Sequence, residues 1–179
     1  TPKTNGMVVV WELDKPMKST ITYGTSDADK KTLEVPVEEG EKFKGESMHM
    51  YRARLTDLTP GTTYTYKVET EDGQTMDGHF RTLPENSDEI RFVVVSDSHR
   101  FETATKVSDV IAQFDPDFIL HTGDMVEGTG SQKDQFPYWF QNVGSFLHNV
   151  PVIYNSGNHD YGAYFDEYVT KVQKEQYKS

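Results

Sequence analysis

The sequence predicts two domains in one chain: an all-β sandwich, followed by an α/β domain with the element order β-α-β-α-β-α. Residues 1–84 contain short segments of alternating polarity between turn residues and show no helical periodicity. From residue 90 onward, continuous apolar segments alternate with segments of helical spacing, which is typical of a parallel sheet. The 179 residues include 35% hydrophobic and 12% aromatic residues, which is enough apolar surface to bury a core.

The first domain, residues 1–84, is predicted to form short strands with one apolar face each. The strand segments are 7–13, 19–23, 33–37, 48–55, 63–70 and 75–81. Pro36 indicates a sheet edge, and Asp72-Gly73 indicates a hairpin turn. Tyr64 starts a strand after Leu58 and a turn, so its hydroxyl is expected to hydrogen-bond back to the preceding loop. This segment resembles a fibronectin type III-like sandwich, which we favour over another small β-domain.

Residues 85–89 are predicted to be a polar linker, and residues 90–179 a second domain. The apolar segments 90–95, 118–120 and 150–154 suit strands that are buried on both faces. A helix is predicted after each strand, with parallel strands and right-handed crossovers. The apolar stripes of these helices are Val107, Val110, Ile111 and Phe114; Trp139, Phe140, Val143 and Leu147; and Tyr161, Tyr164, Phe165, Tyr168, Val169 and Val172.

The composition excludes several classes of function. Eighteen basic and 29 acidic residues give a net charge of −11, which argues against binding to nucleic acid or to an anionic membrane surface. No apolar run reaches the ~18–20 residues of a membrane-spanning helix. The absence of cysteine rules out disulfides and thiolate metal sites. The chain begins with Thr1, and we expect a secreted or cell-envelope protein whose leader is not part of this chain.

Three polar clusters follow the predicted strands of the second domain where these strands end. They are Asp97-Ser98-His99, Gly123-Asp124-Met125-Val126-Glu127 and Gly157-Asn158-His159-Asp160. Because the carboxyl ends of parallel strands meet at one edge of a sheet, we expect the clusters to converge. Their oxygen and nitrogen donors suit Mn, Fe or Zn, and not a soft metal.

Each cluster taken alone has a plainer explanation. A lone Asp97 or Asp124 would be a helix cap. A lone Asn158 would be a turn residue, and a lone His159 a surface histidine. The interpretation as a metal site therefore depends on finding all three clusters, in this order, each after a strand.

With these motifs, the second domain resembles the N-terminal portion of a calcineurin-like metallophosphoesterase. The sandwich before it resembles the arrangement in purple acid phosphatases and their bacterial relatives. The resemblance implies that Asp97 and His99 bind a first metal ion and that Asp124 bridges it to a second. Asn158 would bind the second ion. Both ions would be divalent or trivalent Fe, Mn or Zn.

The resemblance also implies a catalytic role for His159, which would contact the phosphate or the leaving group, with Asp160 or Glu127 orienting it. Two positions depart from purple acid phosphatases. Glu127 stands where they carry an iron-binding Tyr, and His99 stands where they usually have Gly. The family supplies further histidine ligands, but this chain has no histidine after His159. We therefore expect a truncated piece of a longer enzyme, continued after Ser179, or self-association that hides the exposed sheet face.

The function expected of the parent protein is a dinuclear metal-dependent phosphoesterase that hydrolyses small phosphate monoesters, as acid phosphatases do. Its partner would be the phosphate-ester substrate, with no nucleic acid and no membrane. The alternative is a catalytically incompetent fragment, or a binding module based on the β-sandwich. A nucleotide-binding domain is disfavoured because no glycine-rich phosphate loop follows Val95.

Overall fold

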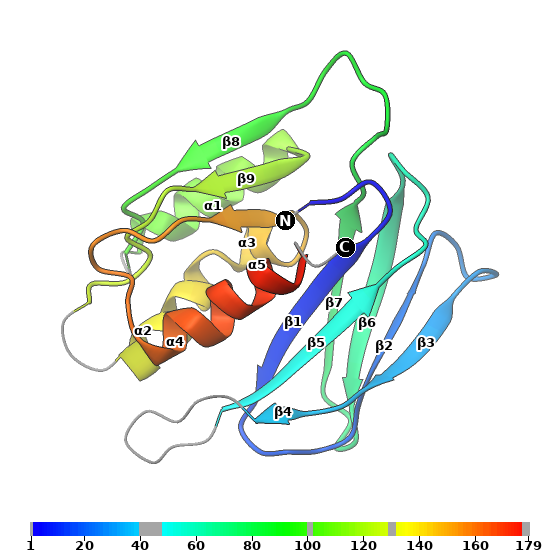
Figure 1. Ribbon diagram of the computed structural model, residues 1–179, viewed down its shortest axis with the longest axis horizontal. Coiled ribbons are helices and arrows are strands. Elements are labelled where there is room, and N and C mark those ends of the chain that lie inside the picture. The colour runs from blue at the N-terminus through cyan, green and yellow to red at the C-terminus, as the bar shows by residue number, and fades with distance from the viewer. Residues whose placement is uncertain (1, 40–47, 100–101, 129–131, 177–179) are drawn as a thin grey trace.

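The computed structural model describes residues 2–39, 48–99, 102–128 and 132–176, which form two adjoining domains (Figure 1). The sandwich strands are β1 (Met7–Leu13), β2 (Ser19–Gly24), β3 (Lys31–Val35), β4 (Glu38–Glu39), β5 (His49–Leu55), β6 (Thr63–Thr70) and β7 (Thr75–Arg81). The second domain has β8 (Phe92–Val95), α1 (Thr103–Phe114), β9 (Phe118–His121), α2 (Gln132–Asn142), α3 (Gly144–Leu147), β10 (Val152–Tyr154), α4 (Ala163–Phe165), the π-helix η1 (Asp166–Thr170) and α5 (Lys171–Gln176).

The first domain packs two antiparallel sheets, with strand orders β1-β5-β4 and β3-β2-β6-β7, face to face. Alternate side chains of both sheets form its core, where the rings of Trp11 and Tyr51 stack at 5.5 Å. The Tyr64 hydroxyl accepts a hydrogen bond from the Thr59 amide at 2.9 Å, as predicted for a corner tyrosine. The predicted sandwich is confirmed, and β3, which precedes Pro36, lies at a sheet edge.

The second domain contains a parallel sheet with the strand order β10-β9-β8, in which Val93 pairs with Ile119 and Ile119 with Val152. The chain adds these strands in one direction. Right-handed crossovers then place their helices, α1 in the first and α2 and α3 in the second, on the same face of the sheet. That face carries Val93, Val95 and Ile119, which pack against α1, α2 and α3 in a shared core. The predicted element order is therefore confirmed.

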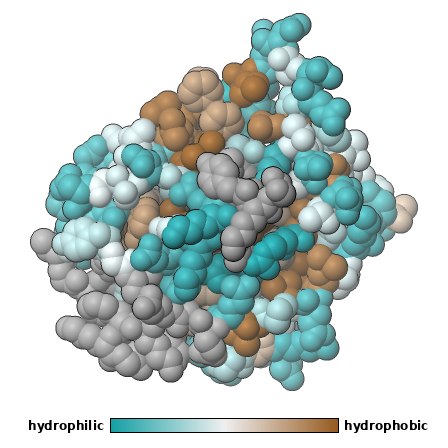
Figure 2. Space-filling view, viewed as in Figure 1, coloured by the Kyte–Doolittle hydropathy of each residue, from teal (hydrophilic) through white to brown (hydrophobic). Residues whose placement is uncertain are grey.

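The strands of this sheet are apolar on both faces, but among the described residues helices cover only one of them, which leaves the exposed sheet face that the sequence predicts for this chain. Phe92 and Val94 point away from the helices and remain 54% and 55% exposed. The Phe92 ring stacks on Phe118 at 5.3 Å, but no described element covers the pair. Figure 2 shows the resulting apolar patch over β8 and β9. The cause is the one-sided placement of the crossover helices.

Helix α1 also differs from its predicted orientation. Its buried face is formed by Ala104, Ser108 and Ile111, whereas Val107 and Val110 are more than half exposed. A helix with apolar residues on more than one face does not reveal from its sequence which face turns inward. None of the helices within the described ranges is both long and apolar enough to cross a membrane.

The last predicted helix is one helical run with a wide turn in its middle. A π-helical segment, η1, separates α4 from α5. At this turn the Glu167 carbonyl accepts a hydrogen bond from Arg52 of β5 at 2.8 Å, and the Glu167 carboxylate accepts another at 3.1 Å. The wide turn thus coincides with a contact between the two domains. The spacing of apolar residues along this helix cannot predict a contact with Arg52, which lies 115 residues away in the chain.

Strand β5 is buried on both faces, because its outer face packs against the second domain (Figure 1). Met50 joins the core of the second domain, and the Arg52 side chain is 1% exposed. Arg52 also pairs with Glu38 at 2.5 Å, so its charge has acidic partners in both domains. A second link is the Tyr66 hydroxyl, which donates to the His148 carbonyl at 2.9 Å. Burial raises the pKa of Tyr66 to about 12, with a smaller contribution from Asp77.

We expect the free energy of unfolding of the Glu167→Gln variant to be about 3 kcal/mol lower than that of the wild type, because the substitution removes one acidic partner of the buried Arg52 charge. The matched control is Glu34→Gln. It breaks the Lys18–Glu34 pair, whose side chains are 59% and 62% exposed, and it should cost less than about 1 kcal/mol. Urea unfolding of both variants measures the difference. Equal, small losses would show that the interdomain pair does not stabilise the fold.

Candidate active site

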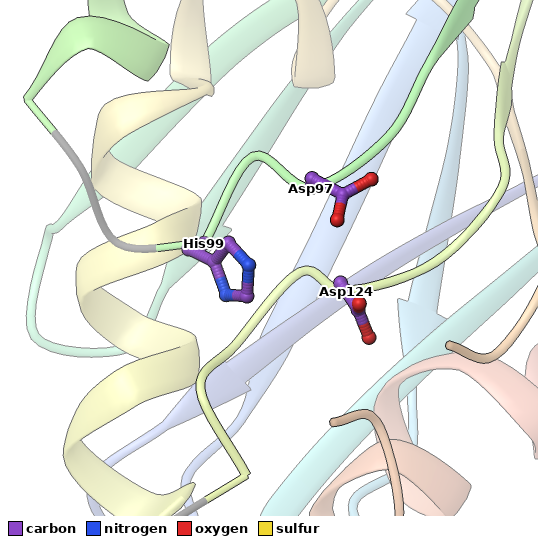
Figure 3. A group of neighbouring side chains, drawn as sticks. All are labelled: Asp97, His99 and Asp124. Atoms are coloured by element: carbon purple, nitrogen blue, oxygen red, sulfur yellow. The ribbon is translucent and has the colours of Figure 1, made fainter. Parts of the chain in front are cut away.

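The three predicted polar clusters meet at the carboxyl edge of the parallel sheet. They occupy the loops that follow β8, β9 and β10. In the first two loops, the side chains of Asp97, His99 and Asp124 point into one space (Figure 3). One possible ligand atom from each of these residues lies within 4.8 Å of the others. Asp97 is exposed, and the other two side chains are half-buried, so the site is open to solvent.

The backbone at these three residues adopts a left-handed conformation that residues other than glycine rarely adopt. Asp97, His99 and Asp124 have positive φ angles of 50°, 41° and 56°. Each such residue costs on the order of 1–3 kcal/mol and persists only where its surroundings enforce it. Two backbone hydrogen bonds enforce it here, from the Asp97 amide to the Gly123 carbonyl at 3.0 Å and from the His99 amide to the Asp124 carbonyl at 3.1 Å.

The loops after β9 and β10 cross so closely that both need glycine. A Cβ atom on Gly123 would lie 2.3 Å from the Gly157 amide nitrogen. A Cβ atom on Gly157 would lie 2.1 Å from the Asp124 carboxylate and 2.6 Å from its amide nitrogen. Gly123 and Gly157, which begin the second and third clusters, are therefore required because the two backbones approach so closely. The same approach brings Asp124 to the His159 amide.

Two carboxylates tie the loops together. Asp124 Oδ1 accepts a hydrogen bond from the His159 amide at 2.9 Å. Asp160 Oδ1 accepts from the Met125 amide at 2.9 Å and the Val126 amide at 3.2 Å, while its Oδ2 accepts from the Gly157 amide at 3.1 Å. Asp160 is 3% exposed, and these backbone contacts give it a role in joining the two loops.

The two histidines of the site are held in the same way. His99 Nδ1 lies 3.2 Å from the Val126 carbonyl oxygen, and His159 Nδ1 lies 2.6 Å from the Glu127 carbonyl oxygen. A carbonyl only accepts, so Nδ1 carries the proton in each neutral ring and the lone pair is on Nε2. This arrangement is usual for histidines that bind metals. The two rings meet edge to face at 5.4 Å.

The remaining predicted residues lie in the same loops. Asn158 lies between Gly157 and His159 and is exposed. Glu127 is half-buried and supplies the carbonyl that holds His159, while its amide donates to Gln135 Oε1 of α2 at 2.8 Å. The sequence analysis assigned no role to Gln135, because nothing local indicates that a glutamine on a helix will support a loop.

A second group missed by the sequence analysis lies beneath the first loop. The Ser98 hydroxyl contacts His121 Nε2 and Trp139 Nε1, each at 2.8 Å. Trp139 was predicted only as part of the core. Its indole N–H was the available signal, because a buried indole usually has a hydrogen-bond acceptor.

A cavity of about 210 Å³ adjoins Asp97, Ser98 and His121, while a larger one of about 510 Å³ lies between β1, β7 and the second domain, away from these loops.

The donors present fit a metal of intermediate hardness. Two carboxylates and an imidazole suit Mn, Fe or Zn, and the Nδ1 hydrogen bond fixes the orientation of the His99 ring and places the lone pair of the neutral ring on Nε2. A parallel sheet with such a site at its carboxyl edge, packed against a β-sandwich, is consistent with the class of metal-dependent phosphoesterases.

Comparison with known families agrees with this class. Residues 90–178 match the calcineurin-like phosphoesterases, and residues 1–82 match the N-terminal domain of purple acid phosphatases. Each of the two domains is therefore similar to a domain of a known phosphatase or phosphoesterase family. The calcineurin-like phosphoesterase match implies divalent metal ions. Among curated proteins, none matches the sequence.

Solved structures share the fold at low sequence identity. The purple acid phosphatase PPD1 from seeds of yellow lupin (Lupinus luteus) superposes with a TM-score of 0.71 at 17% identity, over 93% of this chain and 37% of that one. PhoD superposes with a TM-score of 0.64 at 14% identity, over 89% of this chain and 38% of its own. The chain thus spans a little over a third of the length of these structures.

The loop crossing predicts that Gly157→Ala will destabilise the protein by roughly 1–3 kcal/mol, since the added methyl group collides with Asp124. Gly144→Ala is the matched control. Its Cβ would meet only a His148 ring atom at 3.8 Å, so we expect a change of less than about 1 kcal/mol. Denaturant unfolding of both variants tests this expectation. A Gly157→Ala variant as stable as Gly144→Ala would contradict the close crossing.

Proposed function

We propose that the protein is a dinuclear metal-dependent phosphoesterase that hydrolyses phosphomonoesters. The observation that carries the proposal is the convergence of Asp97, His99 and Asp124 within 4.8 Å at the carboxyl edge of the sheet. The calcineurin-like phosphoesterase match supports the reaction class. One of the similar structures is a purple acid phosphatase, which is consistent with a phosphate ester as substrate.

In this proposal Asp97, His99 and Asp124 would hold one metal ion, and Asn158 together with Asp124 would hold a second. Metal ions bound there would lower the pKa of a water molecule toward neutrality and neutralise phosphate oxygens. The chain positions these ligands through backbone contacts, because the His159 amide holds Asp124 and the Val126 carbonyl holds His99.

His159 has the geometry of a proton donor. Its Nδ1 proton is held by the Glu127 carbonyl at 2.6 Å, so a second proton would reside on Nε2. As the bond between phosphorus and the leaving oxygen breaks, Nε2 would give its proton to that oxygen, and the ring would return to its neutral form.

The proposal is tested by metal uptake together with hydrolysis of p-nitrophenyl phosphate after loading with Mn²⁺, Zn²⁺ or iron. Asp124→Asn should lower metal affinity by more than the ~10–100-fold that is typical of residues outside the ligand set. The control, Asp77→Asn, changes an exposed carboxylate on β7 and should leave affinity unchanged. A wild-type protein that takes up no metal and hydrolyses no ester would support the binding-module alternative.

The number of ligands predicts how many ions the 179-residue chain holds. The first site has three protein ligands, Asp97, His99 and Asp124, while the second has only Asp124 and Asn158. We therefore expect at most one tightly bound metal ion per chain after extensive dialysis, as measured by elemental analysis. Two retained equivalents would contradict this assignment of ligands.

The role of His159 predicts a dependence on the leaving group. His159→Ala should slow the hydrolysis of alkyl phosphates by about 10²–10⁴-fold, but that of nitrophenyl phosphate much less, because nitrophenolate leaves without a proton. His79→Ala, on the exposed surface of β7, is the control and should slow neither substrate. Equal losses with both substrates would exclude proton donation by His159.

A further inference from the structure

Ser98 stands between two proposed metal ligands, Asp97 and His99, and its side chain points to the core. The Ser98 hydroxyl oxygen lies 2.8 Å from Trp139 Nε1 of α2 and 2.8 Å from His121 Nε2 of β9. Both rings are fully buried, and they meet edge to face at 5.7 Å. The first ligand loop is thus anchored to two fully buried side chains.

The direction of each hydrogen bond follows from groups that can only donate. The Gly123 amide donates to His121 Nδ1 at 3.2 Å, so this nitrogen carries a lone pair. In a neutral ring the proton is then on Nε2, which donates to Ser98. Burial lowers the pKa of His121 to about 4, which is consistent with a neutral ring at neutral pH. The indole N–H of Trp139 also only donates. Ser98 Oγ therefore accepts two hydrogen bonds, and both of its lone pairs are occupied.

This anchor acts on strained backbone. Asp97 and His99 both have positive φ angles, and their amides are tied only to the neighbouring loop, at Gly123 and Asp124. Those contacts fix the two loops relative to each other. Ser98 adds the connection to β9 and α2. Without it, the strained residues lose the attachment that keeps them in place above the sheet.

We propose that His121, as the Nε2-protonated tautomer, and Trp139 are positioning residues that hold Asp97 and His99 in their metal-binding conformation through the Ser98 hydroxyl. The expected effect on metal binding rests on the proposed function. The hydrogen bonds of Ser98 to His121 and Trp139 do not depend on it. Neither ring touches the substrate or the metal in this assignment. His121 is thereby excluded as a ligand through Nε2, although it lies at a strand end near the site.

The first test uses the metal-free wild-type chain labelled with ¹⁵N-histidine. The proposal requires that the His121 Nδ1 resonance lies in the unprotonated range and that Nε2 shows a bonded proton. A proton on Nδ1 would overturn it. This measurement needs no variant and no bound metal.

The second test compares two serine-to-alanine variants. Ser98→Ala should shift the backbone amide resonances of Asp97 and His99 and weaken the binding of Mn²⁺ by about 10–100-fold, measured by calorimetric titration. The control is Ser108→Ala on α1, because the Ser108 hydroxyl is buried and has no hydrogen-bond partner among the described residues. It should leave the amide resonances and the affinity unchanged within about twofold.

Rescue separates positioning from general stability. Ser98→Thr keeps the acceptor oxygen, and the adjoining cavity of about 210 Å³ has space for the extra methyl group. The Ser98→Thr variant should therefore retain the Mn²⁺ affinity that the Ser98→Ala variant loses. Equal effects of Ser98→Ala and Ser108→Ala would refute the positioning role. A wild type that binds no Mn²⁺ would instead refute the proposed function, and the resonances of the metal-free chain would still decide the positioning role.

Discussion

The candidate site depends on the crossing of two loops at the carboxyl edge of the parallel sheet. Gly123 and Gly157 let the backbones approach to a distance that any side chain would prevent. Only at this distance does the Asp124 carboxylate reach the His159 amide, and only then does Asp160 reach Met125. Backbone contacts therefore fix the Asp124 and Asp160 carboxylates, while the Ser98 hydroxyl attaches the first loop to the core.

Much of this arrangement was predictable from the sequence, because it follows from the order of the strands. Polar residues that end parallel strands converge whatever the details of the loops, so Asp97, Asp124 and His159 could be assigned to one region. The sandwich was equally accessible, since strand alternation and the corner tyrosine Tyr64 are local signals. In both cases the pattern that indicates the structure lies within a few residues of chain.

What escaped prediction depends on contacts between distant residues. The acceptor of the Trp139 indole lies 41 residues away in the chain, and Arg52 meets Glu167 across 115 residues. An exposed sheet face was expected, but the sequence does not show which residues form it. An apolar strand predicts burial on two faces, but the direction in which strands are added determines where the helices go, and Phe92 carries no trace of that direction.

Strand β5 has a consequence for how the two halves can change over time. One of its faces serves the sandwich core through Tyr51, and the other serves the second domain through Met50 and Arg52. A substitution in this strand must fit two packing environments at once, so the sandwich cannot be exchanged for another sandwich domain without changing its contacts with the second domain. Any protein that received it by recombination would have to cover Met50 and provide an acceptor for the Arg52 guanidinium group, as Glu167 does here.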